Sequence, residues 1–344
     1  MNTNPLVSVV MAVRHNEQYI AEAIQSILNQ SYKHFEFIIV SSFGSHKESV
    51  DIIDSFRDPR IRHVHAESSR SLLPMVINQG LNLAKGKYVA RMDSDDISLP
   101  HRLETEVTFM ENHPDIAIAG SYAKTFGKKN IFMRNPTKPE DIKAHILFHM
   151  SFVNPTVIIR TETLQKEGLL RYDENLKYCE DLDFFVRVAR KICLANIPAV
   201  LLHYRTHDTQ ATHQEKDYQS GIRDAIFQTQ LDQFGVPAGD KKRAVYRSIR
   251  TFREEDASAE FLSTAEAWFQ DLASMNLSRG IYEQNALKGV LANEWFTLCR
   301  LSTKKLGATT WRIFWRSEIR RWLKNEPRTV VRVIKFLFKT RLNK

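Results

Sequence analysis

The amino-acid sequence predicts an α/β fold, in which a mostly parallel sheet is sandwiched by helices and followed by a C-terminal helical region. Between residues 6 and 119, short apolar runs alternate with segments of helical periodicity, which is the pattern of parallel strands joined by crossover helices. From about residue 213 the strand signals fade and helical spacing dominates. The 344 residues, 43% of them hydrophobic, suffice for a large core and a second unit. We therefore expect a first domain at residues 1–212 and a helical region at 213–344.

Strands and helices are expected to alternate in order along the first half of the chain. Apolar runs predict strands at residues 6–13, 35–40, 87–90 and 116–119, and the alternation of residues 61–65 predicts a further strand. Helical spacing of apolar residues predicts helices at 20–28, 50–56, 71–85 and 103–113. Asn16 is a suitable N-cap for the first helix. Gly86 is expected to end the third helix as its C′ residue.

Composition excludes several classes of protein. The three cysteines, Cys179, Cys193 and Cys299, show neither metal-ligand spacing nor a paired framework, which indicates a reducing compartment such as the cytoplasm. The first five residues lack the basic start of a secretory signal. Because no run of 18 uncharged apolar residues occurs, we expect no membrane-spanning helix.

The net charge of +9 is concentrated in the C-terminal tail, where residues 301–344 hold 13 Lys and Arg against two acids. Within 311–344, cationic positions flank a helical apolar stripe that begins with Trp311, Trp315, Ile319 and Trp322. A basic amphipathic tail of this kind predicts binding to the anionic inner face of a membrane. The alternative is that the stripe packs on the protein. Nucleic acid would also suit the charge, but no binding module accompanies it, so no specific nucleic-acid partner is expected.

A cluster of carboxylates follows the predicted fourth strand. Asp93, Asp95 and Asp96 lie within four residues and would repel one another unless a cation sits between them. Carboxylate oxygens suit Mg²⁺ or Mn²⁺, which complete their shells with water and phosphate oxygens. Ligands of open α/β sheets bind at the carboxyl ends of the strands, where this cluster should fall. The alternative is a polar turn that opens the next helix, since Asp and Ser favour turns.

Several ordered motifs resemble those of the family 2 glycosyltransferases of the GT-A fold. The resemblance covers roughly residues 5–212 and rests on residues 7–13, 23–32, 35–40, 99–104, 154–156, 172–173, 180–183 and 204–207, and on Asp93-Ser94-Asp95-Asp96. It implies a Rossmann-like GT-A domain. It also implies transfer of a sugar from a nucleotide-diphosphate donor, with inversion at the anomeric carbon and with Mn²⁺ or Mg²⁺ bound at the acidic cluster.

The resemblance also suggests which residues hold the donor. Asp95 is the expected principal metal ligand, and Asp93 is expected to hold the donor ribose or to share the ion. His207 is expected near the diphosphate, as a metal ligand or a phosphate donor, although it also reads as a polar residue after the strand at 200–204. Arg205 is a phosphate candidate because its planar donors suit phosphate, and Arg91 is a further donor-binding candidate. Asp96 is expected to pair with Arg102 instead.

An acceptor hydroxyl needs a base, because an alcohol barely ionises near neutral pH. Asp181 matches the position of the acidic base in the family's paired-acid motif, at the start of a predicted helix. Glu180 beside it is expected to orient the site. The alternative is electrostatic, since acids in a first helical turn complement the helix dipole without any further role. Asp183 is expected to project from a different side of the helix.

One departure from the family pattern concerns the nucleobase. After the second strand the family usually has two aspartates, of which the first helps to read the base, whereas this chain has Ser41, Ser42 and then Phe43. Serine hydrogen-bonds neutrally and over a shorter reach, which weakens the inference of a uridine-type donor. Asn16, Ser41 and Arg70 are candidates for the donor pocket. The alternatives are that Asn16 only caps its helix and that Arg70 is a solvated loop charge.

These observations favour an inverting, metal-dependent glycosyltransferase that works on a nucleotide sugar and a glycan or lipid-linked acceptor. The expected setting is assembly of bacterial surface polysaccharide or lipopolysaccharide, on the cytoplasmic face of the cell membrane. The helical region at 213–344 is a candidate for acceptor choice or for dimerisation, so an oligomer is compatible with the sequence. Two alternatives remain: a non-catalytic nucleotide-sugar-binding relative, and a protein that binds nucleic acid through its basic tail.

Overall fold

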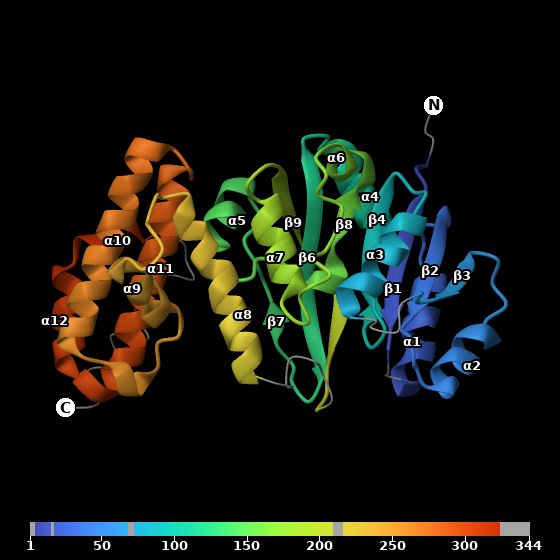
Figure 1. The fold of residues 1–344 in the computed structure, drawn as a ribbon, viewed down its shortest axis with the longest axis horizontal. Coiled ribbons are helices and arrows are strands. Elements are labelled where there is room, and N and C mark those ends of the chain that lie inside the picture. Colours follow the sequence, from blue (N-terminus) through green and yellow to red (C-terminus); the bar gives the residue numbers. More distant parts are fainter. Residues whose placement is uncertain (1–3, 15–16, 68–71, 209–215, 324–344) are drawn as a thin grey trace. The chain divides into compact units, whose positions relative to one another are not determined.

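The computed structural model describes residues 4–14, 17–67, 72–208 and 216–323 (Figure 1). Asn16, Arg70 and residues 324–344 of the basic tail lie outside the described residues. The chain forms two compact units. The first consists of Met1–Ile142 and Met150–Arg223, and the second of Lys143–His149 and Asp224–Lys344.

The first unit is built on parallel strands in the order β3-β2-β1-β4. These are β1 (Val7–Val13), β2 (Phe35–Ser41), β3 (Ile61–His65) and β4 (Tyr88–Asp93), and every neighbouring pair among them is parallel. The connections are α1 (Glu17–Leu28), α2 (Lys47–Ser55) and α3 (Leu73–Leu83). The predicted order of strands and helices is confirmed here. Because the chain order reverses between β1 and β4, their carboxyl ends frame the position at which such sheets bind ligands.

Helices cover both faces of this sheet, as the alternation along β2 shows. Phe37 and Ile39 belong to the core that α1 and α2 cover, whereas Ile38 and Val40 pack with Val76 of α3 on the opposite face. Helix α3 approaches the sheet closely at Gly80, where an added Cβ would lie 2.5 Å from Cγ1 of Val10.

Strand β4 is longer than the apolar run predicts. It continues through Arg91 and Met92 to Asp93, because β1 pairs with it as far as Ala12 opposite Asp93. The prediction that Gly86 is a helical C′ residue is wrong. Helix α3 ends at Leu83 with an extended C-cap at Ala84, and Gly86 does not have a positive φ. Instead, an added Cβ on Gly86 would lie 2.6 Å from the backbone nitrogen of Ser8, so glycine allows the two backbones to approach.

The remaining strands make the sheet mixed rather than mostly parallel. From β4 the order continues β8-β6-β9-β5, with β8 antiparallel to both β4 and β6 and β9 parallel to β6. These strands are β5 (Ile97–Ser98), β6 (Ile116–Gly127), β7 (Phe132–Met133), β8 (Ile158–Arg160) and β9 (Cys193–Thr206). The helices of this part are α4 (Arg102–Asn112), α5 (Pro139–His145), α6 (Thr161–Lys166) and α7 (Glu180–Val188).

The described part of the second unit is helical, which confirms the predicted C-terminal helical region. Helix α8 (Lys216–Gln228) leads into α9 (Lys241–Arg250), α10 (Ala259–Arg279), α11 (Gln284–Leu306) and α12 (Ala308–Arg316). Ser258 caps α10 by accepting a hydrogen bond from the Phe261 nitrogen, and Gly280 ends it in the left-handed conformation. Trp268, Phe269 and Trp295 are buried in this unit.

The apolar stripe predicted to begin at Trp311 does not continue as one helix. Helix α12 ends at Arg316, and a short 3₁₀ turn, η5 (Glu318–Trp322), follows. Of the stripe residues, Ile319 is buried, Trp311 and Trp322 are partly buried, and Trp315 keeps 38% of its surface exposed. Among the described residues, no helix is both long and apolar enough to cross a membrane.

Candidate active site

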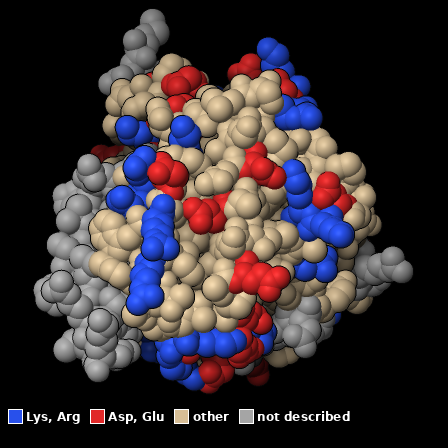
Figure 2. Space-filling view, turned by 90° about the vertical axis from the view of Figure 1, so that its left-hand side faces the viewer, with Lys and Arg blue, Asp and Glu red and all other residues tan. Residues whose placement is uncertain are grey.

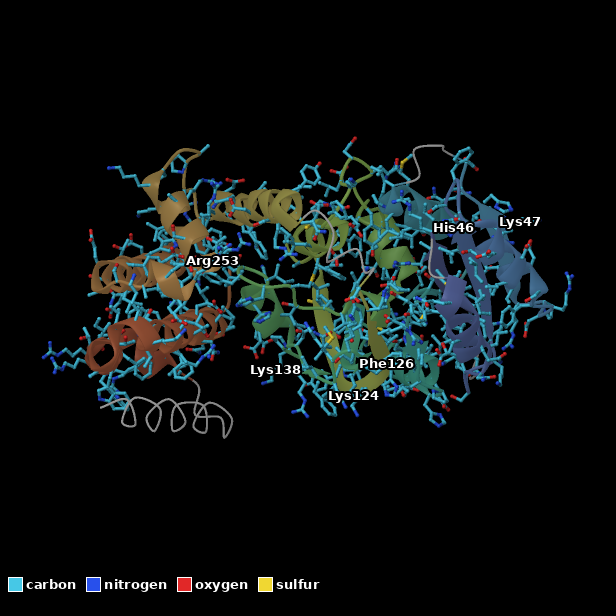
Figure 3. All side chains as sticks on the ribbon, turned by 90° about the horizontal axis from the view of Figure 1, so that it is seen from below. His46, Lys47, Lys124, Phe126, Lys138 and Arg253 are labelled. Atoms are coloured by element: carbon cyan, nitrogen blue, oxygen red, sulfur yellow. The ribbon has the colours of Figure 1, made fainter. Side chains whose placement is uncertain are left out.

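The candidate site lies where the parallel strands of the first unit end. Figure 3 views the molecule from below, the side toward which β1 runs from the N-terminus in Figure 1. His46 and Lys47 lie beyond the end of β2 in this view, and Phe126 lies near the end of β6. Asp93 is the last residue of β4, Ser41 the last of β2, and the two strands flank β1.

The acidic loop after β4 is fastened to the end of β9 by Arg205. The Arg205 backbone nitrogen donates to Oδ1 of Asp96 at 2.8 Å, and its Nε donates to the carbonyl oxygen of Asp95 at 2.6 Å. Its guanidinium also pairs with Glu22 of α1 and lies over the ring of Phe126, 4.4 Å from the centroid. Arg205 therefore positions the loop. Its contact with phosphate stays a prediction.

Asp95 and His207 are brought together although 112 residues separate them. His207 Nε2 lies 2.9 Å from Oδ2 of Asp95, and both side chains remain partly exposed, at 10% and 16%. The ring of His207 lies against Tyr19, with 5.1 Å between ring centroids. Asp95 and His207, two of the three residues expected to bind metal, thus lie side by side at the carboxyl edge of the sheet.

The donor set suits a metal that substrate helps to hold. Among the described residues, no group of three or more His, Cys, Asp or Glu side chains is placed to hold a metal ion by itself. At phosphate sites, however, Mg²⁺ takes one or two protein ligands and completes its shell with phosphate oxygens and water, and Mn²⁺ accepts the same oxygen ligands. Asp95 and His207 fit this kind of site. Asp93, by contrast, is tied to Arg91, whose Nη2 lies 3.3 Å from its Oδ1.

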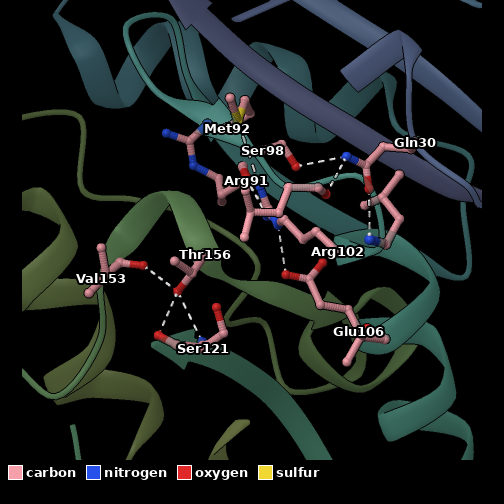
Figure 4. A network of polar contacts seen from close by, with 12 residues as sticks. Gln30, Arg91, Met92, Ser98, Arg102, Glu106, Ser121, Val153 and Thr156 are labelled. Carbon is pink, nitrogen blue, oxygen red and sulfur yellow. Dashed lines mark hydrogen bonds and ion pairs between the residues drawn. The ribbon is translucent and has the colours of Figure 1, made fainter. Parts of the chain in front are cut away.

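The predicted pair between Asp96 and Arg102 is wrong. Arg102 donates from Nε to Oε1 of Glu106 at 2.7 Å and from Nη2 to the carbonyl oxygen of Arg91 at 2.7 Å (Figure 4). Arg102 and Glu106 are one helical turn apart on α4 and both are fully buried, so they pair with each other. Asp96 is also buried, and its Oδ2 has no hydrogen-bond partner among the described residues. Burial, and then the charges of Asp95 and Asp93, raise the pKa of Asp96 well above its ordinary value.

Two further networks hold the surroundings of β4 in place (Figure 4). Gln30 donates to Oγ of Ser98 at 3.1 Å and accepts from the backbone nitrogen of Leu103 at 3.0 Å, which fixes the chain between the acidic loop and α4. In the Asn-Pro-Thr motif, Oγ1 of Thr156 accepts from the backbone nitrogen of Ser121 at 3.0 Å. Gln30 and Thr156 both lie in motifs that carry the family resemblance, and both have positioning roles in the structure.

Helix α7 presents the paired acids from an unusual start. Its N-cap residue, Cys179, has a φ of 61° and is the one non-glycine residue with positive φ in the described part of the chain. The left-handed turn places Glu180 and Asp181 in the first helical turn, and Oδ1 of Asp181 accepts from the backbone nitrogen of Leu182 at 2.7 Å. Asp183 instead pairs with Arg187 at 2.7 Å, as expected for a residue on another side of the helix.

The acids of α7 and the acid that ends β4 share one electrostatic environment. Burial, opposed by Arg91 and reinforced by Asp95 and Asp181, raises the pKa of Asp93 to about 6. Burial, followed by the charges of Asp181 and Asp93, raises the pKa of Glu180 to about 8. Burial also raises the pKa of Asp181, against the lowering effect of the Leu182 N–H and of Arg223. The structure therefore brings Asp93, Glu180 and Asp181 together.

Tyr172 is a residue of this site to which sequence reasoning assigned no role. Its hydroxyl is buried and has no hydrogen-bond partner among the described residues. Burial raises the pKa of Tyr172, and the charges of Arg91, Asp181 and Glu180 also act on it. The backbone of Tyr172 exchanges two 2.9 Å hydrogen bonds with the side chain of Asn78 in α3. The Tyr172-Asp173 motif was the available signal, but only the fold places the ring beside the acids.

Ser41, predicted as a donor-pocket residue, is fully buried at the end of β2. Its Oγ lies 3.0 Å from Nδ1 of His65 and 3.0 Å from Nε2 of His63, both on β3. Neither histidine was among the predicted site residues. The signal that would have identified them is the pairing of β2 with β3, in which Ser41 faces His65.

Comparison with known proteins gives relatives for most of the chain. The model of the family described as Glycosyl transferase family 2 matches residues 8–170. An uncharacterized glycosyltransferase of Haemophilus influenzae is 31% identical over 256 residues, which cover 69% of this chain and 77% of that protein. The O-antigen biosynthesis glycosyltransferase WbnJ of Escherichia coli is 29% identical over 215 residues, which cover 59% of this chain and 80% of that protein.

A solved structure supports the fold. The crystal structure of S. aureus TarS in complex with UDP-GlcNAc aligns with a TM-score of 0.58 and 16% identity, over 93% of this chain and 93% of that one. This likeness confirms the predicted GT-A-like fold with its C-terminal helical region. Taken with the family match and the Haemophilus relative, it leads to one conclusion: the chain belongs to glycosyl transferase family 2.

Proposed function

We propose that this glycosyltransferase moves a sugar, with inversion, from a nucleotide-diphosphate donor to a hydroxyl of a glycan or lipid-linked acceptor. One observation carries the proposal: Asp93, at the end of β4, lies close enough to Asp181 of α7 for Asp181 to raise its pKa. The acidic loop is the proposed diphosphate site and α7 the proposed acceptor site. A single displacement needs the two sites to adjoin, because the reacting atoms must be held in contact.

Asp181 is the proposed general base. In the proposed step the acceptor oxygen bonds to the anomeric carbon, the bond from that carbon to the diphosphate oxygen breaks, and the hydroxyl proton passes to Asp181. Burial raises the pKa of Asp181, which makes its carboxylate a stronger base. Glu180, with its pKa raised to about 8, holds its proton at neutral pH, so its proposed role is to orient the site.

Asp95 and His207 are the residues proposed to hold Mn²⁺ or Mg²⁺. When bound there, the cation would neutralise the charge that develops on the departing diphosphate. Arg205 keeps the loop that carries Asp95 in place through its contacts to Asp95 and Asp96. Arg91 is fully buried and faces Asp93, so it supplies a fixed positive charge at the end of β4.

The proposed setting is surface-polysaccharide assembly in a bacterium, at the cytoplasmic face of the membrane. The support is that one relative is named an O-antigen biosynthesis enzyme. The basic segment 311–344 is proposed to hold the enzyme at anionic lipid. On the face drawn in Figure 2, Lys and Arg are interspersed with Asp and Glu, whereas seven of the 13 basic tail residues fall in 324–344. Co-sedimentation with phosphatidylserine vesicles should require residues 311–344; unchanged binding after their deletion would reject the anchor.

A turnover screen tests the proposed function. Purified full-length protein is incubated with Mn²⁺ and a panel of nucleotide sugars, and release of nucleoside diphosphate is measured with candidate acceptors. For an active pair, Asp181→Asn should reduce the rate by about 10³-fold, since a positioned base contributes 10² to 10⁴, while donor binding stays within about twofold. Asp183→Asn on the same helix is the matched control and should remain close to wild type.

The same screen separates the enzyme from its main alternative, a non-catalytic nucleotide-sugar-binding relative. That alternative is favoured by Ser41 and Ser42 standing where the family usually has acids. It predicts that donor binds without turnover in the wild-type chain. Full turnover by Asp181→Asn would instead remove Asp181 from the role of base.

A further inference from the structure

Four polar side chains form a continuous hydrogen-bonded chain across α2 and the ends of β2 and β3. Asp54 of α2 lies 2.7 Å from Nδ1 of His63. Nε2 of His63 lies 3.0 Å from Oγ of Ser41, which lies 3.0 Å from Nδ1 of His65. Ser41 is fully buried, His63 keeps 11% of its side chain exposed, and His65 is exposed. The chain therefore starts at the surface on Asp54 and returns to it at His65.

The direction of each hydrogen bond follows from the first. A carboxylate can only accept, so Asp54 places the proton of neutral His63 on Nδ1 and leaves Nε2 as an acceptor. Ser41 then donates its O–H to Nε2 of His63; the carbonyl oxygen of Val64, at 3.5 Å, is the longer option. The Ser41 oxygen in turn accepts from Nδ1–H of His65. Nε2 of His65 is thereby left with a lone pair, and no described residue donates to it.

The position of His65 relative to the proposed reaction is set by the sheet order β3-β2-β1-β4-β8-β6-β9. In Figure 1, α7 lies on the β6 and β9 side of β4, whereas β2 and β3 lie on the other side. A donor with its sugar at α7 and its diphosphate at the end of β4 must extend its nucleoside past β1. Neighbouring strands are about 4.8 Å apart, so the end of β3, which His65 forms, is about 14 Å from that of β4.

We propose that His65 reads the nucleobase of the donor, with Nε2 accepting a hydrogen bond from a ring N–H of the base. This inference rests on the proposed function. Uracil, thymine and guanine carry a ring N–H on the edge used for pairing, whereas cytosine and adenine carry a lone pair there. The selected class is therefore uracil, thymine or guanine. The chain from Asp54 supplies a neutral acceptor at the strand end where this sequence has serines instead of acids.

A second feature, close in sequence to the hydrogen-bonded chain, suits a nucleobase. Phe43, two residues after Ser41, keeps 63% of its surface exposed. Exposed aromatic rings beside a polar reader are the usual surface on which bases stack, because every base has a flat face. Phe43 is proposed to support the base without distinguishing one base from another, and the selection is left to His65.

The test measures binding of UDP, dTDP, GDP, CDP and ADP to the full chain by calorimetry, in the presence of Mn²⁺. Inorganic pyrophosphate is the probe without a base. At least one of UDP, dTDP and GDP should bind about tenfold or more tightly than both CDP and ADP. His65→Ala should remove that preference and leave pyrophosphate binding unchanged. His46→Ala, a nearby histidine outside the chain, is the matched control and should retain the preference.

The Asp54→Asn variant distinguishes a loss of nucleobase selection from a loss of folding, because Asp54 does not touch the proposed ligand. The amide no longer requires the proton on Nδ1 of His63, so the preference should fall while pyrophosphate affinity and melting temperature stay close to wild type. Equal affinity for all five nucleotides, or an unchanged preference in His65→Ala, would overturn the inference and leave the proposed function standing. Failure of every diphosphate to bind, pyrophosphate included, would overturn both.

Discussion

The acidic edge at β4 and α7 and the polar edge at β2 and β3 hold their charges in opposite ways. At the acidic edge, Asp93, Asp96, Glu180 and Asp181 all have raised pKa values, with burial as the first cause in each case. At the polar edge, Asp54, His63, Ser41 and His65 satisfy one another through three short hydrogen bonds. The first arrangement opposes folding and favours a cation, whereas the second stabilises the folded chain.

This difference separates two kinds of binding. Crowded carboxylates that repel one another are stabilised when positive charge arrives, so the acidic edge suits a cation and the phosphates that accompany it. A satisfied chain of neutral groups offers one aligned acceptor and little net charge, which suits a nucleobase. Replacing a carboxylate of the acidic edge by a neutral group should therefore stabilise the protein. Removing a hydrogen-bonding group of the polar edge should destabilise it.

The largest effect on stability is expected for Glu180→Gln. The pKa of Glu180 is raised from 4.5 to about 8 in the folded protein, so the folded state binds this proton more tightly than the unfolded chain. The contribution of Glu180 to stability should accordingly be fully present below about pH 4.5 and should be lost as the pH rises to about 8. Because glutamine does not ionise, the variant should become more stable than the wild type over that range, by on the order of 3 kcal/mol.

Urea unfolding at pH 5, 6, 7 and 8 would measure this difference. Glu162→Gln, which replaces an exposed acid on α6, is the control and should leave the pH slope of the wild type unchanged. A Glu180→Gln variant that is less stable than the wild type at pH 8 would show that the acidic edge does not carry the predicted repulsion.

A smaller effect of opposite sign is expected for Ser41→Ala. The substitution removes the hydroxyl that joins His63 to His65 and should lower the free energy of unfolding by about 1 kcal/mol, the usual contribution of a hydrogen bond. Thermal unfolding of this variant beside Ser42→Ala, its neighbour outside the chain, would measure the loss. An equal or smaller loss in Ser41→Ala than in Ser42→Ala would contradict the assigned chain.

The features that could be predicted from sequence are those that local patterns determine. The apolar runs of β1 and β2, the alternation along β3 and the helical spacing of α1 and α2 indicate their structures directly, because buried faces need apolar side chains. The start of β4 was equally clear, but its end was not, since pairing with Ala12 of β1 extends the strand to Asp93. The proximity of Asp93 to the acids of α7 followed from the family resemblance alone.

The features that were missed depend on contacts between distant segments. The sequence analysis pairs Arg102 with Asp96, but burial of Arg102 with Glu106 on one helical turn determines the pair. The chain from Asp54 to His65 depends on the β2–β3 register, and the placement of β8 between β4 and β6 depends on pairings that no local pattern specifies. A motif identifies a candidate residue, and its partners follow only from the fold.

The central claim is that the acidic loop binds the donor through a metal held at Asp95. The most direct measurement is a calorimetric titration of the nucleotide sugar that is turned over, with Mn²⁺ and with EDTA, for the wild type, Asp95→Ala and the exposed-site control Asp115→Ala. Binding by the wild type and by the control should require Mn²⁺, and Asp95→Ala should weaken it by about 100-fold or more, because even loss of a residue that only supports a metal ligand costs about 10- to 100-fold. Tight binding in EDTA, or Mn²⁺-dependent binding that survives in Asp95→Ala, would contradict the account.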